Sequence, residues 1–225
     1  TVMDMPNTIP ATTGAKEIKE KLALARNRSS ANIHFHIGAT NSNHSNLAQI
    51  ASQGCPEEGL KAEDIAGIKV FMGSSTGNML VNDDESLKEL FSIKEKPILV
   101  HCEDEDTIKR NLQAAKEKYG DDIPFEEHKN IRSRMACIKS TIKALELAMK
   151  YQTRLVLCHI STMEEVEMAR AAKLNNPEII AETSCNYLWF SDEAYSRLGS
   201  RIKCNPSVKS DSDRQALRNA LRDGH

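Results

Sequence analysis

Three short apolar runs in the sequence each contain, at or near their ends, a side chain that could do chemistry. Lys69 lies in Gly67-Ile-Lys-Val-Phe-Met-Gly-Ser-Ser-Thr-Gly77, His101 in residues 97–102 and His159 in residues 154–160. An unpaired ammonium in an apolar interior costs several kcal/mol, so Lys69 either lies at a sheet edge or is buried for a reason. The runs are typical of buried strands, and barrel enzymes hold their chemistry at the carboxyl ends of such strands.

A lysine and two histidines cannot hold a metal ion in the ordinary way, because an ammonium has no lone pair to donate. If burial deprotonates Lys69, the amine can add carbon dioxide and become an anionic carbamate whose two oxygens bridge two cations. Two divalent ions about 3.5–4 Å apart lower the pKa of a shared water and polarise a carbonyl, which prepares the hydrolysis of an unreactive amide. His101 and His159 would be ligands of one ion. The structural alternative is a Lys69 that reaches solvent or pairs with a carboxylate.

His34 and His36 form a second candidate pair. They alternate with apolar residues in the run Ile-His-Phe-His-Ile, so both imidazoles should point to one face of a strand at residues 32–38. An HxH pair on a strand is a common zinc-binding arrangement. We favour the structural interpretation, in which both are hydrogen-bonded interior residues on the polar side of a barrel.

The elements that must position these side chains alternate between helix and strand. Helices are expected at residues 15–28, 45–52, 84–93, 104–119, 129–151, 162–174 and 211–222, and strands at 32–38, 178–183 and the three apolar runs, after a strand end at residues 1–10. This alternation predicts right-handed βαβ units and a parallel sheet. In the longest helix the spacing of the large apolar residues predicts a core-facing stripe made of Met135, Ile138, Ile142, Leu145 and Met149.

Composition narrows the class of protein. The chain has 225 residues and a net charge of -2, which favours one domain and gives no basic face for nucleic acid. Its six cysteines contain no CxxC pair, which is typical of a reduced, cytoplasmic protein. No run reaches transmembrane length and no signal peptide opens the chain, so no membrane partner is expected. Oligomeric state is left open, with a homo-oligomer as one option.

Several further motifs accompany the Lys69 stretch. They are Asp4-Met-Pro-Asn-Thr-Ile-Pro10, Leu99-Val-His-Cys-Glu103, Val156-Leu-Cys-His-Ile-Ser161, Glu182-Thr-Ser-Cys-Asn-Tyr-Leu-Trp-Phe-Ser191 and Lys203-Cys-Asn-Pro206. Together, and in the same order, these motifs resemble those of dihydroorotases of the amidohydrolase superfamily. The resemblance is to the longer type, related to the dihydroorotase domain of multifunctional pyrimidine enzymes, and it covers essentially the whole chain.

The resemblance implies an α/β fold of the (β/α)8 TIM-barrel type with two divalent metal ions, usually Zn2+. Such enzymes interconvert N-carbamoyl-L-aspartate and L-dihydroorotate in de novo pyrimidine biosynthesis, by means of a hydroxide that bridges the metals. By position, Lys69 is similar to the carbamylated bridging lysine, and His101 and His159 to the paired histidine ligands of the second metal. Asn7 and Asn205 match the asparagines that bind the small-molecule substrate, and an amide suits that task because it both donates and accepts.

The resemblance also implies what is missing. In the family the HxH pair lies on the first barrel strand, with a substrate-binding arginine after it, whereas His34 and His36 would lie on the third. The aspartate that ligates metal and moves the proton belongs to strand eight, which is expected after His225. Residues 1–225 would therefore be the central part of a single catalytic domain, with about six of eight strands, truncated at both ends. We expect this segment to contain no catalytic acid or base and to be inactive alone.

Two departures and two alternatives accompany this interpretation. Cys185-Asn-Tyr187 stands where many family members have Pro-His-His, and Asn205-Pro-Ser207 where they have Asn-Pro-Pro; the first affects the expected substrate details more than metal binding. Within the superfamily, an allantoinase or another cyclic-amide hydrolase would share the barrel, the lysine and the metals. In a different class, the chain could belong to a catalytically inactive assembly scaffold, although a scaffold needs no buried lysine.

Overall fold

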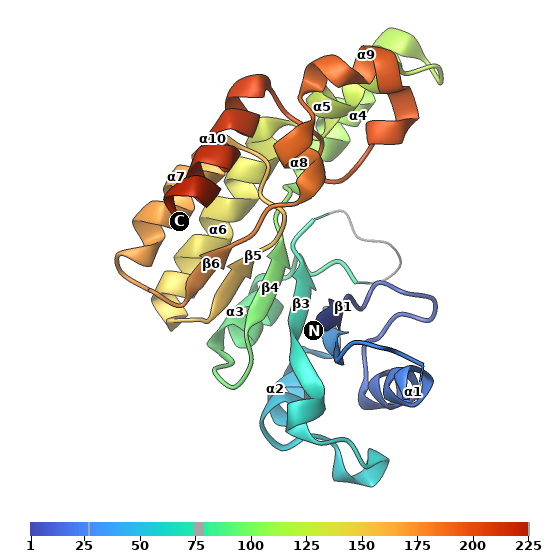
Figure 1. Ribbon diagram of the computed structural model, residues 1–225, viewed down its shortest axis with the longest axis vertical. Coiled ribbons are helices and arrows are strands. Elements are labelled where there is room, and N and C mark those ends of the chain that lie inside the picture. The colour runs from blue at the N-terminus through green and yellow to red at the C-terminus, as the bar shows by residue number, and fades with distance from the viewer. Residues whose placement is uncertain (27, 74–78, 225) are drawn as a thin grey trace. The chain divides into compact units, whose positions relative to one another are not determined.

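The computed structural model describes residues 1–26, 28–73 and 79–224 of the chain. Ser74, Ser75, Thr76 and Gly77, which end the Lys69 stretch, and His225 lie outside the described residues. The chain forms two compact units, Thr1–His101 with Lys150–Val156, and Cys102–Met149 with Leu157–His225. Figure 1 labels most of the helices and strands of both units, and each unit is described by itself.

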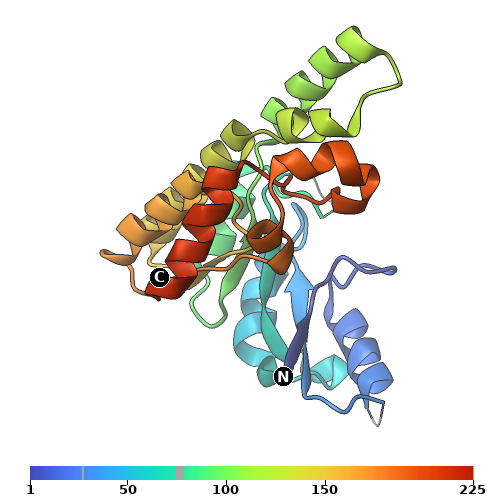
Figure 2. The same cartoon turned by 45° about the horizontal axis from the view of Figure 1, so that its top comes forward.

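The first unit is a parallel sheet with helices between consecutive strands. Its elements are β1 (Val2–Asp4), α1 (Ala15–Ala25), β2 (Ile33–Gly38), α2 (His44–Gln53), β3 (Ile65–Phe71), α3 (Asp84–Ser92), β4 (Ile98–His101) and the start of β5 (Leu155–Leu157), with short 3-10 helices at Pro56–Glu58 and Ala62–Asp64. The strands are adjacent in sequence order from β1 to β5, and α1 packs against β2 (Figure 2).

The register of β3 and β4 fixes which side chains share a face. Lys69 is opposite Leu99 and Phe71 is opposite His101, so these four side chains point to the same side of the sheet, because successive residues of a strand alternate. The intervening residues Ile68, Val70, Ile98 and Val100 point to the other side and are all 0% exposed. The apolar face of these strands is therefore core, and the opposite face presents the lysine and the histidine.

The second unit is mostly helical. It contains α4 (Glu105–Tyr119), α5 (His128–Ile131), most of α6 (Arg134–Tyr151), the end of β5, α7 (Met163–Lys173), β6 (Ile179–Ala181), α8 (Cys185–Trp189), α9 (Tyr195–Leu198) and α10 (Asp211–Asp223), with short 3-10 helices at Phe125–Glu127, Asp192–Ala194 and Gly199–Ile202. Leu157 of β5 accepts a backbone hydrogen bond from Glu182, directly after β6. α10 lies beside α7 (Figure 2).

The longest helix differs from its prediction in two ways. It is divided into α5 and α6, because Arg132 leaves the helical conformation at φ -91° and ψ 66°. The expected core stripe is also wrong, since Met135, Ile142 and Met149 are 50%, 42% and 39% exposed, and of the five predicted residues Leu145 alone is buried. The buried face of α6 consists mainly of small side chains, at Ala136, Cys137, Ser140, Thr141, Ala144 and Ala148. Small residues let the helix approach its neighbours closely, so the bulky ones remain outside.

The main predictions about the fold are confirmed. Strands and helices alternate as expected, and the sheet formed by the described residues has six strands in the order β1-β2-β3-β4-β5-β6. Within the described parts of the chain, no helix combines the length and the apolar character that a membrane crossing requires. The assignment of residues 1–225 to one catalytic domain stays a prediction.

Candidate metal and substrate site

Lys69 and His101 are brought together on one face of the first unit. Lys69 is 2% exposed and His101 is 4% exposed. Both approach the ring of Phe71, whose centre lies 5.1 Å from Lys69 Nζ and 5.8 Å from the centre of the His101 ring. An ammonium over an aromatic face gains cation–π attraction, but this is a weak substitute for a carboxylate or for water.

The surroundings of Lys69 fit the chemistry predicted for it. No described residue forms an ion pair or a hydrogen bond with Lys69, so the structural alternative, a lysine paired with a carboxylate, finds no support among the described residues. The solvent-reaching alternative is excluded by its burial. No three His, Cys, Asp or Glu side chains form a ready metal cluster in the described ranges. A carbamate on Lys69 would add an anionic oxygen ligand beside the His101 imidazole.

His36 and His34 have different environments, although they are two residues apart on β2. His36 is 3% exposed and pairs with Gly67 of β3, which lies two residues before Lys69. Its side chain therefore points to the same face of the sheet as Lys69. Burial lowers the pKa of His36, and the nearby Lys69 charge lowers it further, while hydrogen bonding to the Gly67 backbone opposes the shift. The interior placement predicted for both histidines is wrong for His34, which is exposed at the start of the strand and lines an open hollow of about 860 Å3.

Asn7 lies in a turn just after β1. Its side chain is exposed, and the turn is closed by the Pro6 carbonyl, which accepts backbone hydrogen bonds from Thr8 and Thr12, both at 2.9 Å. Lys21 on α1 forms an ion pair at 2.6 Å with Asp4, the last residue of β1. Asn7 thus lies on a turn that is held by backbone hydrogen bonds, and its side chain is exposed.

His159 belongs to the second unit and lies two residues after the end of β5. Its φ of 43° lies in the left-handed region, which non-glycine residues seldom adopt and which is common at functional turns. The chain after it is fixed by the buried carboxylate of Glu165, which accepts from the Ser161 and Thr162 amides at 3.0 and 3.1 Å. Burial raises the pKa of Glu165, and these hydrogen bonds oppose the rise. The Thr162-x-x-Glu165 spacing is a capping box that the sequence already displays.

Asn205 also belongs to the second unit and is exposed in the turn before α10. The residues on both sides of it are anchored by long-range hydrogen bonds. His128 contacts the Cys204 carbonyl at 2.8 Å, and Tyr187 donates to the Pro206 carbonyl at 2.6 Å. No local sequence pattern indicates the contact of His128, because this residue lies 76 positions from Cys204.

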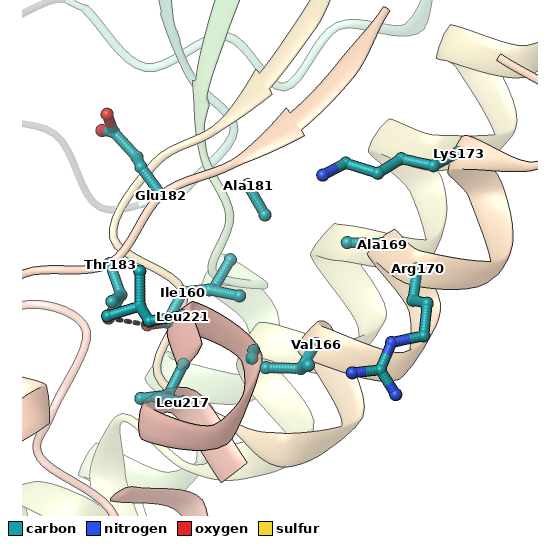
Figure 3. A pocket seen from close by; sticks show the side chains of 11 residues that line it. Ile160, Val166, Ala169, Arg170, Lys173, Ala181, Glu182, Thr183, Leu217 and Leu221 are labelled. Carbon is teal, nitrogen blue, oxygen red and sulfur yellow. Dashed lines mark hydrogen bonds between the residues drawn. The ribbon is translucent and has the colours of Figure 1, made fainter. Parts of the chain in front are cut away.

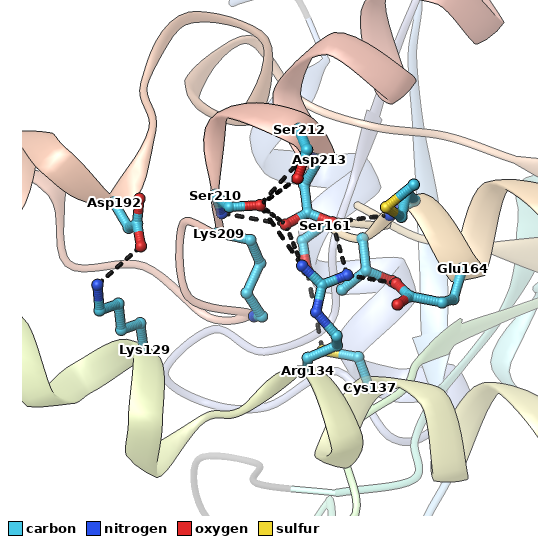
Figure 4. A network of polar contacts seen from close by, with 12 residues as sticks. Lys129, Arg134, Cys137, Ser161, Glu164, Asp192, Lys209, Ser210, Ser212 and Asp213 are labelled. Carbon is cyan, nitrogen blue, oxygen red and sulfur yellow. Dashed lines mark hydrogen bonds and ion pairs between the residues drawn. The ribbon is translucent and has the colours of Figure 1, made fainter.

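A polar network joins the amino ends of three helices in the second unit (Figure 4). The Arg134 guanidinium at the start of α6 pairs with Glu164 on α7 and with Asp213 on α10. Asp213 is 1% exposed and also accepts from the Met163 amide at 2.9 Å. Burial alone would raise the pKa of Asp213, but hydrogen bonds from Ser210, Arg134 and Met163 outweigh it and lower the pKa. This network is structural rather than part of the predicted site.

A separate apolar pocket of about 240 Å3 lies between α7, α10 and β6 (Figure 3). Ile160, Val166 and Leu217 form part of its wall, and Arg170 and Lys173 lie at its polar side. It contains none of the predicted metal or substrate residues. The predicted chemistry therefore does not depend on this pocket.

Comparisons with known proteins identify the family. No protein-family model matches the chain. A dihydroorotase from Methanosarcina acetivorans is 32% identical over 100% of this chain and 47% of its own length. A dihydroorotase from Methanosarcina mazei is 31% identical over 100% of this chain and 48% of its own length. An allantoinase from Desulfitobacterium hafniense is 28% identical over 92% of this chain and 44% of its own length.

Solved structures agree on the fold. The L-hydantoinase from Arthrobacter aurescens superposes with a TM-score of 0.86 at 23% identity, covering 99% of this chain and 48% of the other. A dihydroorotase from Campylobacter jejuni gives a TM-score of 0.66 at 16% identity, with 99% and 58% covered. The chain spans about half the length of the curated relatives it matches. The strands of the described residues correspond to part of a TIM barrel, and the chain belongs to the dihydroorotase family.

Proposed function

We propose that the protein is a dihydroorotase, which interconverts L-dihydroorotate and N-carbamoyl-L-aspartate in the cytoplasm as a step of pyrimidine biosynthesis. The observation that supports this most is Lys69, a lysine 2% exposed, without a carboxylate partner in the described residues, and on the same sheet face as His101. A buried amine in such a place is costly unless it is used. The two Methanosarcina dihydroorotases also match over the whole chain at 32% and 31% identity, whereas the Desulfitobacterium hafniense allantoinase is 28% identical over 92% of it.

The proposed site distributes its tasks among five residues. Lys69, as the carbamate formed with carbon dioxide, and the imidazoles of His101 and His159 would hold two divalent ions, with zinc as the expected metal. When bound, such ions polarise the amide carbonyl and supply a water that is acidic enough to attack it at neutral pH. Asn7 and Asn205 would orient the substrate through amides that donate and accept. In the hydrolytic direction water adds to the ring carbonyl, the ring C–N bond breaks, and the nitrogen takes a proton.

The proton carrier is expected outside residues 1–225. None of the residues that we assign here is an acid or base in the reaction, and the family's aspartate belongs to a later strand. We therefore expect the isolated 225-residue chain to be inactive, even if it binds a metal ion weakly. Production of dihydroorotate from carbamoyl-aspartate by this chain alone would contradict the assignment.

A second candidate is an allantoinase or a hydantoinase, which the allantoinase relative at 28% identity supports. A substrate panel on the full-length protein separates these activities, with dihydroorotate, allantoin and hydantoin compared at equal concentration and bound metal measured by elemental analysis. Turnover confined to dihydroorotate, with two metal ions per chain, is the expected result. Turnover of allantoin alone would replace the proposed substrate, and a metal-free, inactive protein would support the scaffold alternative.

A further inference from the structure

The backbone of the turn that carries Asn205 is held by hydrogen bonds to other parts of the second unit. Three hydrogen bonds surround it. His128 bonds the Cys204 carbonyl at 2.8 Å, Tyr187 donates to the Pro206 carbonyl at 2.6 Å, and Ser207 donates to the Arg132 carbonyl at 2.8 Å. The backbone is thus held immediately before Asn205 and immediately after it. The asparagine side chain between these points remains exposed.

The protonation state and burial of His128 suit a hydrogen-bond donor that is held in one orientation. A carbonyl oxygen can only accept, so Nε2 of His128 must carry the hydrogen in this contact. His128 is 8% exposed, and its ring lies edge-on to the Tyr195 ring at 6.3 Å between centres. Burial lowers the pKa of His128, and the Arg132 and Lys203 charges lower it further, against the opposing hydrogen bond to Cys204. His128 is therefore neutral near pH 7, with its single hydrogen directed at the turn.

The element that carries His128 is itself anchored. Arg132, which directly follows α5, forms an ion pair with Glu103, whose side chain is fully buried, while the Arg132 side chain is 13% exposed. The Arg132 carbonyl also accepts a hydrogen bond from the Ser207 hydroxyl. Tyr187 approaches from α8 and is 4% exposed. Two helices distant in sequence thus contribute one donor each to the carbonyls that flank Asn205.

We propose that His128 and Tyr187 are positioning residues for Asn205. They hold the turn in one conformation before the substrate arrives, so that binding does not have to order it. This inference rests on the proposed role of Asn205 in binding dihydroorotate. Neither residue is expected to touch the substrate or the metal ions.

Full-length variants test the proposal through the steady-state kinetics of dihydroorotate. His128→Phe keeps an aromatic ring but removes the donor, and should raise KM by about two- to tenfold with a smaller change in kcat. His128→Gln retains an N–H in a similar place and should restore most of the affinity. Tyr187→Phe, which removes one hydroxyl, should act as His128→Phe does. Metal content should stay unchanged in all three variants, and His44→Phe, on α2 in the first unit, serves as a matched control with unchanged KM.

A double-mutant cycle with Asn205→Ala separates this inference from the proposed function. If His128 acts through Asn205, adding His128→Phe to Asn205→Ala should raise KM no further. Additive effects, or a His128→Gln variant as impaired as His128→Phe, would overturn the positioning role alone. An Asn205→Ala variant with normal KM would instead refute the substrate-binding role of Asn205, and this inference with it. If His128→Phe fails to fold, the cycle is run with Tyr187→Phe.

Discussion

Lys69 and His101 lie on the same face of the sheet, on adjacent strands, and both contact the ring of Phe71. This relationship follows from the register, which pairs Lys69 with Leu99 and Phe71 with His101. The imidazole and the amine therefore need no rearrangement of β3 or β4 to face the same space. Their burial excludes most water from that space, which strengthens any charge interaction made there.

Replacement of Lys69 should affect activity and stability in opposite directions. In the full-length protein Lys69→Ala should reduce turnover of dihydroorotate by at least about a hundredfold, since even the outer partners of metal ligands contribute about 10- to 100-fold. A short carboxylic acid in the buffer should restore part of it. In the 225-residue chain Lys69→Met should leave the free energy of unfolding unchanged or raise it by about 1 kcal/mol, because it removes a buried amine at similar volume. Unchanged turnover in Lys69→Ala would contradict the carbamate role.

The left-handed backbone at His159 allows its side chain and its conformation to be tested separately. His159→Ala and His159→Gly both remove the imidazole, so both should lower the metal content of the full-length protein to the same extent. Glycine adopts a φ of 43° without strain, whereas alanine does not. His159→Gly should therefore be more stable than His159→Ala by about 1 kcal/mol in urea unfolding. Full metal occupancy in both variants would assign His159 a structural role.

The network around Asp213 should matter for stability alone. Asp213→Ala removes the acceptor of the Arg134, Ser210 and Met163 hydrogen bonds at the start of α10, while Arg134 keeps its ion pair with Glu164, so the free energy of unfolding should fall by about 1–3 kcal/mol. Arg222→Ala offers a matched control, because its side chain is 74% exposed and its ion pair with Asp223 lies at the surface. It should change stability by less than about 0.5 kcal/mol. Equal effects of the two variants in urea unfolding would show that the network is not a stabilising one.

Buried His128 should make stability depend on pH. Its pKa is lower in the folded chain than its ordinary value of about 6.5. Below that value the unfolded chain binds a proton that the folded chain does not, so stability is full above about pH 6.5 and falls as the pH falls. His128→Gln removes this contribution and should lose less stability between pH 7.5 and pH 5.5. Identical losses in urea midpoint for both proteins would indicate that His128 titrates normally.

The corrected orientation of α6 makes a fifth prediction. Ala144 is 0% exposed and Ile142 is 42% exposed. Ala144→Leu should overfill the close contact and lower the free energy of unfolding by about 1–3 kcal/mol. Ile142→Ser, in the predicted but incorrect stripe, should cost less than about 1 kcal/mol. The reverse order of the two effects would restore the original prediction.

The sequence predicted the strands better than the orientation of the helices. The runs around Lys69 and His101 are apolar on both faces apart from the functional side chains, so their burial and their order were predictable. Periodicity points to the wrong face of α6 because it favours large apolar residues, whereas close packing places Ala136, Ala144 and Ala148 inside. The partners of Asn205 could not be predicted, since a hydrogen bond between His128 and Cys204 depends on a chain path that no local pattern encodes.

Neither compact unit is a continuous piece of polypeptide, since the chain leaves the first after His101, returns at Lys150 and departs again after Val156. The amide of Ile98 bonds the Arg154 carbonyl at 2.8 Å, so β4 gains this neighbour only after the whole of α6 has been synthesised. During synthesis on the ribosome, this edge of β4 therefore stays unpaired until Arg154 has been added to the chain. A cut between residues 101 and 150 would leave each unit assembled from separate fragments, neither of which is a self-sufficient domain.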